Sequence, residues 1–540
     1  MANLLVEAKK LPEKADQNCP LVVIQCIEDP LFYGLFASLM LELRRTCGAR
    51  GALLLARSIN GAVGVSWLAM IARSLPLAWM ITSQWARVNR NLVGPVAYRS
   101  HSLRHPFWDI MDIWRSWKIW RRLRRADDIL NLKIDGVHIG DLVVDSYLRF
   151  RPSPRFNVGD RFVWRVLWQT LRDLRRACHY FKMARPALYL SNNSTYVEHG
   201  VPVRVALSLN IPVRVFGNLA VFGKLLTQDD VFQTKDTSDY RRVFESLENP
   251  HHLLNEADKE LAFRLSGGVD SATSYMKASA YSQSEETVPD VSGAVVVFMH
   301  DFYDSPHIYA DLIFVEFWAW ISCTINTLTD AGVPFWLKPH PNQIALSNEA
   351  LHLLQETFPQ ARLLSSKITN IQLVKAGMLC GVTVYGTVAH ELAYMGIPSI
   401  ACARHPHHAF DFCRTARSVA EYQAYLRTPS VSPLSSDEMR RQALAFYYMH
   451  NLFGNRESRE LRRTFSEIWR LAHSTYENSG QLAVALDHIR TLPGWHDYIR
   501  ELSETLTTRT NTGLETPFDS GGLNPHHIFT REKHLAGYSS

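Results

Sequence analysis

Two short segments in the second half of the chain carry residues suited to binding a phosphate. The first is Trp336-Leu-Lys-Pro-His-Pro341, in which an apolar run ends at a lysine and a histidine. If that run is a strand, Lys338 and His340 lie at its carboxyl end, and the two prolines stiffen the loop that carries them. A cation and an imidazole fixed in this way are placed to meet a phosphate group.

The second segment is Val384-Tyr-Gly-Thr-Val-Ala-His-Glu-Leu-Ala393. Gly386 allows a ligand to approach the backbone, and Thr387 is expected to cap a helix that begins beyond it. The free N–H groups at such a helix start would bind an anion. Glu391 follows one turn later on the same face, where its carboxylate is expected to accept hydrogen bonds from ribose hydroxyls. Taken singly, each part is also typical of an ordinary turn or cap.

With Gly396-Ile-Pro398 added, the order of these motifs resembles the donor half of GT-B glycosyltransferases of bacterial surface polysaccharides, including capsule polysaccharide synthesis proteins and Kdo transferases. The Gly-Thr-x-x-x-Glu segment is also similar to that of lipid A disaccharide synthase. The resemblance is specific over residues 295–405 and diffuse elsewhere. It implies a nucleotide-sugar donor on the C-terminal domain, an acceptor on the N-terminal domain and chemistry in the cleft between them.

One departure from that family bears on the donor. The capsule Kdo and sialic acid transferases tend to carry Ser-Ser or Ser-Thr where this chain has Gly386-Thr387. This puts a CMP-linked donor in doubt and leaves UDP or GDP sugars open. In this interpretation Lys338, His340 and the Gly386-Thr387 helix start stabilise the charge that grows on the leaving nucleotide.

A further polar loop, His300-Asp-Phe-Tyr-Asp-Ser-Pro-His307, follows directly after the apolar run that ends at Met299. His300, Asp304 and His307 could contact phosphate or sugar hydroxyls there. The same residue types could instead bind a metal, or the loop could be structural. Because enzymes of the resembled family characteristically need no metal, neither a metal nor another cofactor is expected.

The first half of the chain offers four candidates for the general base that an inverting transfer needs within hydrogen-bond reach of the acceptor hydroxyl. Asp141 and Asp145 are four residues apart, so both carboxylates share one face if their segment is helical. Glu198 and His199 follow another predicted strand. The sequence does not choose among the four, and each could simply cap or solvate a helix.

Ser266-Gly-Gly-Val-Asp-Ser271 matches the pyrophosphate loop of ATP-pyrophosphatases letter for letter. That chemistry requires a buried strand that leads into the glycines, whereas the residues before Ser266 form a charged helical pattern. A helix-ending turn is therefore the favoured interpretation, and a buried strand that ends at Leu265 would overturn it.

The elements that must position these residues alternate between short apolar runs and helical patterns, which predicts parallel sheets with crossover helices. The rhythm occurs twice, so the expected fold class is α/β with two doubly wound, Rossmann-like domains and a C-terminal helical section. The expected organisation is a polar leader at 1–20, an N-terminal acceptor domain at 21–285, a nucleotide-sugar domain at 286–430, helices at 431–504 and a disordered tail at 505–540.

Composition narrows the class of protein further. The 540 residues carry a formal charge of +6 with 46% hydrophobic residues, an ordinary globular balance. The eight cysteines form no C-x-x-C pair, so the spacing indicates neither a zinc site nor a disulfide framework. The leader lacks an apolar core, and Arg57 and Arg73 interrupt the most apolar stretch, 51–85. A cytoplasmic protein is expected, with peripheral attachment to the inner face of the cytoplasmic membrane as an option.

That attachment would use the basic aromatic stretch at 114–125. Residues 101–185 contain 18 Lys and Arg against 9 Asp and Glu, so positive charge is concentrated there. Trp and Arg together suit an anionic membrane surface or an acidic glycan. The alternatives are a solvated helix whose tryptophans pack inward and a nucleic-acid site, which is disfavoured because no binding module surrounds the stretch.

The function predicted from the sequence is thus transfer of a sugar from a nucleotide-sugar donor to an envelope polysaccharide or glycolipid. A polyol-phosphate transferase of the teichoic-acid type is the first alternative, because it shares the frame and a His-Pro loop. A non-catalytic assembly protein on the same scaffold is the second.

Overall fold

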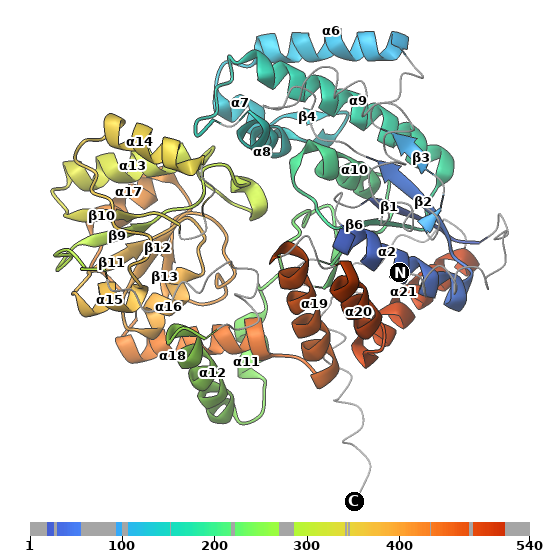
Figure 1. Ribbon diagram of the computed structural model, residues 1–540. Coiled ribbons are helices and arrows are strands. Elements are labelled where there is room, and N and C mark those ends of the chain that lie inside the picture. Colours follow the sequence, from blue (N-terminus) through green and yellow to red (C-terminus); the bar gives the residue numbers. More distant parts are fainter. Residues whose placement is uncertain are drawn as a thin grey trace, which may run out of the picture.

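The computed structural model describes residues 19–25, 30–55, 93–94, 96–99, 106–151, 153–217, 222–268, 286–340, 343, 346–432, 434–474 and 479–512. Two parallel sheets, each covered by helices on both faces, form two lobes that lie side by side (Figure 1). The predicted fold class, two doubly wound Rossmann-like domains with a C-terminal helical section, is confirmed.

The first sheet has the strand order β3-β2-β1-β6-β7-β8, in which only the last pair is antiparallel. Its strands are β1 (Leu21–Gln25), β2 (Arg50–Leu55), β3 (Val96–Arg99), β6 (Leu188–Ser191), β7 (Val213–Phe216) and β8 (Gly223–Leu226). β1 and β6 are buried because nearly all of their side chains are apolar and face helices on both sides.

Three helices cover one face of this sheet: α8 (Gly140–Phe150), α9 (Arg161–Ala184) and α10 (Tyr196–Ser208). They are joined to α6 (Pro106–Arg122), which packs on α9, and to α7 (Ala126–Leu130) and the hairpin β4 (Lys133–Ile134) and β5 (Val137–His138). The other face is covered by α2 (Pro30–Cys47) together with α19 (Arg456–Ser474), α20 (Ser479–Ile489) and α21 (Pro493–Thr512). The last described helices of the chain therefore return to the first domain.

The second sheet is wholly parallel, with the order β10-β9-β11-β12-β13. Its strands are β9 (Val295–Phe298), β10 (Phe335–Lys338), β11 (Cys380–Val382), β12 (Ser399–Ala401) and β13 (Cys413–Thr415). One face packs against α13 (Phe317–Asp330), α14 (Ser347–Thr357) and α17 (Val419–Arg427), and the other against α15 (Asn370–Lys375) and α16 (Val388–Tyr394).

Three more helices lie beside α16: α11 (Tyr240–Glu245), α12 (Pro250–Leu265) and α18 (Ser436–Tyr447). The sequence grouped the first two with residues 21–285, but they share their apolar cores with the second domain. On this packing we propose that the domains divide between β8 and α11. α21 is regular to Thr512, whereas a disordered tail was expected from residue 505.

α12 also decides the interpretation of the Ser266-Gly-Gly-Val-Asp-Ser271 motif. A helix ends at Leu265, and Ser266 is its C-cap, so no strand leads into the glycines. The pyrophosphatase context is absent from the described part of this segment; Asp270 and Ser271 lie outside the described residues. The predicted helix-ending turn holds for residues 266–268.

Candidate functional site

Each sheet has one point where the strand order reverses, between β1 and β6 in the first and between β9 and β11 in the second. Ligands of doubly wound sheets bind beyond the carboxyl ends of the strands at that point. The loop that leaves β9 carries residues 300–307, and it packs directly on α8 of the first domain. The two predicted constellations, one from each half of the chain, therefore meet at the domain interface.

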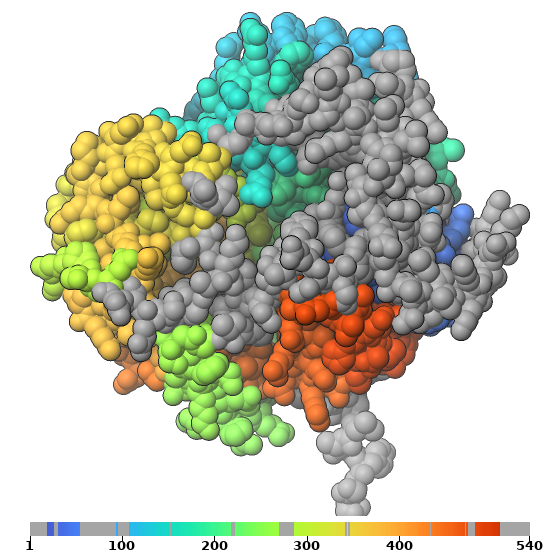
Figure 2. Space-filling view, in the orientation of Figure 1, coloured from blue at the N-terminus to red at the C-terminus, as the bar shows by residue number. Residues whose placement is uncertain are grey.

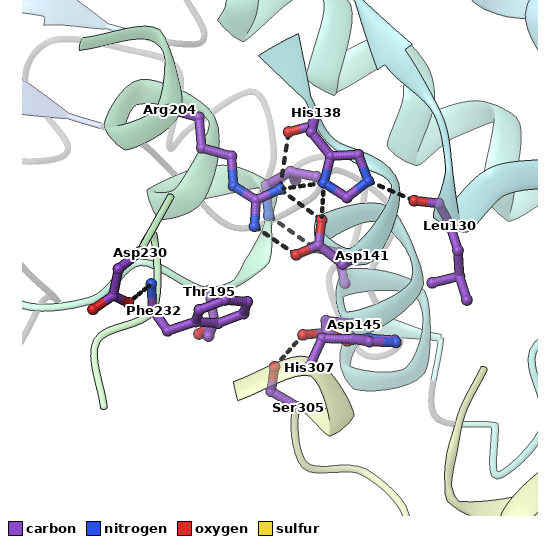
Figure 3. Close-up of polar contacts among 12 residues, drawn as sticks. Leu130, His138, Asp141, Asp145, Thr195, Arg204, Asp230, Phe232, Ser305 and His307 are labelled. Carbon is purple, nitrogen blue, oxygen red and sulfur yellow. Dashed lines mark hydrogen bonds and ion pairs between the residues drawn. The ribbon is translucent and has the colours of Figure 1, made fainter. Parts of the chain in front are cut away.

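The central contact there joins Asp145 of α8 to His307 (Figure 3). His307 Nδ1 lies 2.6 Å from Asp145 Oδ1, and the Ser305 hydroxyl donates to the other carboxylate oxygen. Asp145 is buried, and only 10% of the His307 side chain is exposed. A carboxylate at Nδ1 fixes the imidazole as the tautomer with its proton on Nδ1, which leaves Nε2 as the acceptor.

Nε2 of His307 is buried and has no hydrogen-bond partner in the described structure. Burial lowers the pKa of His307, but the negative charge and the hydrogen bond of Asp145 outweigh burial, so the pKa lies above its ordinary value. The pair thus has the parts of a general base: an acceptor nitrogen without a partner, an orienting carboxylate and a basicity tuned upward.

Asp141 lies one turn from Asp145 on the same face of α8, as the sequence predicted, but its chemistry differs. Both of its oxygens accept from the Arg204 guanidinium of α10, with one contact at 2.6 Å, and His138 lies 3.6 Å away (Figure 3). Burial alone would raise the pKa of Asp141; the charge of Arg204 more than offsets it and holds the pKa well below its usual range. A carboxylate held in this way is a poor base.

Close packing of α8 and α10 makes the Asp141–Arg204 pair possible. At Gly200 a Cβ atom would lie 2.4 Å from the Leu142 side chain and 2.7 Å from the Ser194 carbonyl oxygen. Only glycine therefore permits this approach of the two helices. Tyr196, the first residue of α10, has a φ of +57°, a strained value for a residue with a side chain.

The remaining base candidates are less suited to the role. Burial lowers the pKa of His199 to about 4, so this side chain is neutral and weakly basic. Its Nε2 atom lies 3.6 Å from Oε1 of Glu198. The Glu198 backbone carbonyl accepts a hydrogen bond from Gln25 at the end of β1, which fixes the start of α10 on the sheet. Both residues lie near the first switch point.

Tyr385 connects the His307–Asp145 pair to the second sheet. Its hydroxyl donates to the Ser305 carbonyl oxygen at 3.3 Å, and its ring centre lies 4.6 Å from that of His300. Asp304, next to Ser305, keeps an exposed side chain, although desolvation by the surrounding protein raises its pKa. Asp304 also influences the pKa of both Tyr385 and Tyr196, so these three groups are close enough to interact.

The predicted phosphate residues do gather at the carboxyl edge of the second sheet. His300 Nε2 lies 3.2 Å from Thr383 Oγ1, and the same hydroxyl accepts from the Gly386 backbone N–H at 3.1 Å. Burial, with a smaller effect of His340, lowers the pKa of His300 to about 3, so its imidazole is neutral. Thr383 was not among the predicted residues, although it directly follows the apolar run of β11.

Lys338 is the last residue of β10 and is buried, with Nζ 5.9 Å from the centre of the Phe298 ring. Burial lowers the pKa of Lys338 to about 8, against an upward effect of Glu391. The ammonium therefore stays mostly charged at neutral pH. Burial also lowers the pKa of His340, opposed by Asp301. A buried cation beside a strand end is a suitable partner for a phosphate.

Two details of the Gly-Thr-x-x-x-Glu segment differ from the prediction. Thr387 adopts helical angles and its side chain makes no cap bond, and α16 is only seven residues long. Glu391 is 2% exposed, and its oxygens accept from Arg264 at 2.9 Å and from Asn370 at 2.8 Å. With both oxygens engaged, Glu391 is not available to ribose hydroxyls in this structure. It ties α12 and α15 to α16 instead.

Glu316, a titratable residue near the His307–Asp145 pair, was not among the residues predicted from the sequence. Glu316 caps α13 by accepting the backbone N–H groups of Trp318 and Ala319. Burial raises its pKa to about 7, and His307 is among the charges that act on it. Its position before a helical pattern predicts a cap, but nothing in the sequence relates it to a residue on the preceding loop.

Within the described residues, one group of three could supply metal ligands: His405, His407 and Cys413, whose ligand atoms lie within 4.8 Å of one another. The two imidazoles are stacked, with centres 3.7 Å apart and planes 27° apart. A metal binds in the plane of an imidazole ring, so stacked rings do not converge on one ion. The pKa of His405, lowered by burial to about 3, and the stacking of His407 on Phe412 fit packed neutral imidazoles. We assign no ion to this group.

No protein-family model matches this chain, and no curated protein matches it either. Among solved structures, it is similar to a UDP-GlcNAc 2-epimerase from Methanocaldococcus jannaschii bound to UDP-GlcNAc and UDP, with 11% identity over 58% of this chain and 85% of that one and a TM-score of 0.24. The calicheamicin glycosyltransferase matches with 9% identity over 80% and 95%, at a TM-score of 0.23. A Medicago truncatula enzyme complexed with UDP-glucose matches with 10% identity over 90% and 99%, at 0.21. At these scores the likeness carries no argument about activity.

Proposed function

We propose that this protein is a metal-independent glycosyltransferase of the GT-B type that moves a sugar from a nucleotide-sugar donor to an envelope polysaccharide or glycolipid. The observation that carries the proposal is the His307–Asp145 pair, formed across the interface of two Rossmann-like domains, in which Nε2 of His307 is buried without a hydrogen-bond partner in the described structure. The order of the Lys-Pro-His-Pro, Gly-Thr-x-x-x-Glu and Gly-Ile-Pro motifs on the second sheet supports the donor side.

In the proposed reaction, His307 Nε2 accepts the proton of the acceptor hydroxyl as its oxygen bonds to the anomeric carbon of the sugar. The bond from that carbon to the nucleotide phosphate breaks, and the phosphate leaves with the electron pair. Asp145 stabilises the imidazolium that forms. A direct displacement of this kind inverts the anomeric configuration.

Positive charge for the leaving phosphate comes from Lys338 and, when protonated, His340 at the end of β10. A buried cation stabilises a growing negative charge more strongly than a solvated one, because less water screens it. The pKa of Lys338, lowered to about 8 by burial, would rise again when a phosphate binds beside it. These charges support a donor-phosphate site at the edge of β10, with the acceptor between that edge and α8.

Nucleotide release from a panel of UDP, GDP and CMP sugars, in the presence of candidate glycan acceptors, tests the proposal. His307→Ala is expected to abolish acceptor-dependent release while nucleotide binding, measured by calorimetry, persists. His352→Ala, an exposed histidine on α14 of the same domain, is the matched control and should not change the rate.

Three results would contradict the proposal in different ways. Near-normal turnover by His307→Ala or by His340→Ala would remove the roles assigned to those residues. A product joined through a phosphodiester would indicate a polyol-phosphate transferase. The absence of nucleotide binding to the wild-type protein would favour a non-catalytic scaffold.

A further inference from the structure

The surface helix α6 has an unusual distribution of side chains. Six of its apolar residues are exposed: Phe107 (64%), Ile110 (62%), Trp108 (54%), Trp114 (51%), Trp117 (44%) and Met111 (41%). They account for half of the exposed large hydrophobic side chains in the described residues. The helix lies along the outer edge of the first domain, at the top of the molecule (Figures 1 and 2).

Three polar side chains of α6, those of Asp109, Asp112 and Ser116, are directed inward towards α9. Asp109 accepts from Arg175 at 2.7 Å and from Arg176 at 2.8 Å, and Asp112 accepts from Arg175 at 2.8 Å, both arginines belonging to α9. Ser116 accepts from the Trp164 indole at 3.0 Å. These partly buried contacts fix the rotation of α6 about its axis.

A half-turn of α6 about that axis would hide the apolar side chains, but it would break all of these ion pairs. Leaving the charged partners buried without one another costs several kcal/mol. The ion pairs with α9 therefore hold α6 in the orientation that exposes its apolar face. Trp120 shows the contrast: it faces inward, donates to the Val158 carbonyl oxygen at 2.8 Å and stacks on Trp164.

Positive charge follows the apolar face towards the C-terminal end of the helix. Residues 106–125 contain six Lys and Arg, of which Arg115 pairs with Asp135 and Arg125 with Asp127. The two aspartates of the segment are neutralised by the arginines of α9. The Lys118 ammonium lies 3.4 Å from the centre of the Trp114 ring, and the Arg121 guanidinium lies 5.9 Å from that of Trp117. Indole rings with cations above them match the boundary between acyl chains and anionic headgroups.

None of the described helices combines the length and the apolar character that a bilayer-crossing helix requires. α6, which spans roughly 25 Å at 1.5 Å per residue, instead has the composition of a helix that lies in the plane of a membrane surface. Its outer face is mainly apolar from Phe107 to Trp117, with the exposed Arg115 among these residues, and basic from Lys118 onward.

We propose that α6 docks this protein on an anionic lipid bilayer, with the aromatic side chains of residues 107–117 in the interfacial layer and the basic residues of 118–125 on lipid phosphates. The proposal does not depend on the enzymatic activity. It also differs from the sequence-based expectation for 114–125, because the apolar contact begins about two turns earlier, at Phe107.

Co-sedimentation with vesicles tests the proposal directly, using phosphatidylcholine alone and phosphatidylcholine mixed with phosphatidylglycerol. The wild-type protein is expected to bind the mixed vesicles, with indole fluorescence quenched by brominated lipid. Trp108→Ser with Trp114→Ser should remove both the binding and the quenching. Arg121→Gln with Arg122→Gln should weaken binding to mixed vesicles roughly 30-fold, at about 1 kcal/mol for each charge.

Phe263→Ser, which removes a similarly exposed aromatic residue from α12, is the matched control and should leave vesicle binding unchanged. Because all the substituted side chains are exposed, the variants are expected to fold. Thermal melts check this and so distinguish a loss of vesicle binding from a loss of folding. Equal binding to neutral and anionic vesicles, or unchanged binding by the double tryptophan variant, overturns the proposal. If the wild-type protein self-associates and does not bind vesicles, and the double tryptophan variant loses that self-association, a second copy of the chain covers this face and the proposal is overturned.

Discussion

The variant Asp145→Asn tests whether the His307–Asp145 contact supports a general base or is merely structural. The substitution keeps the shape of the side chain and a hydrogen-bond acceptor for His307 Nδ1, but it removes the negative charge. In the wild-type protein that charge, 2.6 Å from Nδ1, outweighs burial and raises the pKa of His307. Without it, burial dominates and the pKa of His307 should fall below its ordinary value.

The expected size of the effect follows from the electrostatics. Two unit charges 4 Å apart interact by about 4 kcal/mol at an effective dielectric constant of about 20, and this attraction is what stabilises the imidazolium as the proton is transferred. Loss of a term of this size, with loss of tautomer control, corresponds to a decrease in kcat of roughly 10³ to 10⁴. Donor KM should change little, because Asp145 belongs to the acceptor side.

The assay is the initial rate of nucleotide release as a function of pH. A base must be unprotonated, so wild-type activity should rise with pH through the raised pKa of His307. In Asp145→Asn the acid limb should move to lower pH while the plateau falls. An unmoved acid limb, or a plateau within a few-fold of wild type, would refute the assignment. Ser305→Ala, which removes only the second hydrogen bond to Asp145, is the milder control.

The same pair has a consequence for stability. Because the folded-state pKa of His307 is raised, the contribution of the pair is fully present below the unfolded pKa of about 6.5 and is lost as pH rises through the folded pKa. As pH rises above about 6.5, the wild-type protein should therefore lose a small increment of stability, measured by thermal melting, that Asp145→Asn lacks. Parallel curves for the two proteins would contradict this linkage.

Three further predictions concern other residues. Lys338→Gln should raise donor KM and lower kcat, in steady-state kinetics, because the leaving phosphate loses a buried cation; equal kinetics would place the phosphates elsewhere. Arg264→Leu should destabilise the protein by about 3–5 kcal/mol in denaturant unfolding, because Glu391 is then buried without its partner, and Glu391→Gln in the same chain should recover part of that loss. Asp270→Asn should leave nucleotide release unchanged, since no strand leads into its motif, and ATP binding lost on this substitution would reverse that conclusion.

The elements that position the site were predictable because local patterns determine them. Short β-branched runs such as Val295–Phe298, followed by polar loops, favour buried strands, and their alternation with helical patterns favours parallel pairing. The shared face of Asp141 and Asp145 follows from helix geometry alone. These predictions needed no knowledge of distant residues.

The partners of the charged groups were not predictable, since they are distant in sequence. Asp145 and His307 are 162 residues apart, and Glu391 and Arg264 are 127 apart. Each residue was visible as a candidate, but only the packing of α8 on the β9 loop turns two candidates into a pair. For Glu391 the packing had the opposite effect, because α12 supplies an arginine where a ribose was expected.

The return of the chain to its first domain has a consequence for how the protein folds during synthesis. α2 and one face of the first sheet are covered by Trp495, Leu502 and their neighbours on the last helices. While the ribosome is still translating the middle of the chain, that apolar face has no cover. The second domain, whose described strands and helices lie between residues 240 and 452, can be completed first. The domain that begins the chain is thus the last to mature, and a nascent chain released before α21 emerges would expose a surface prone to aggregation.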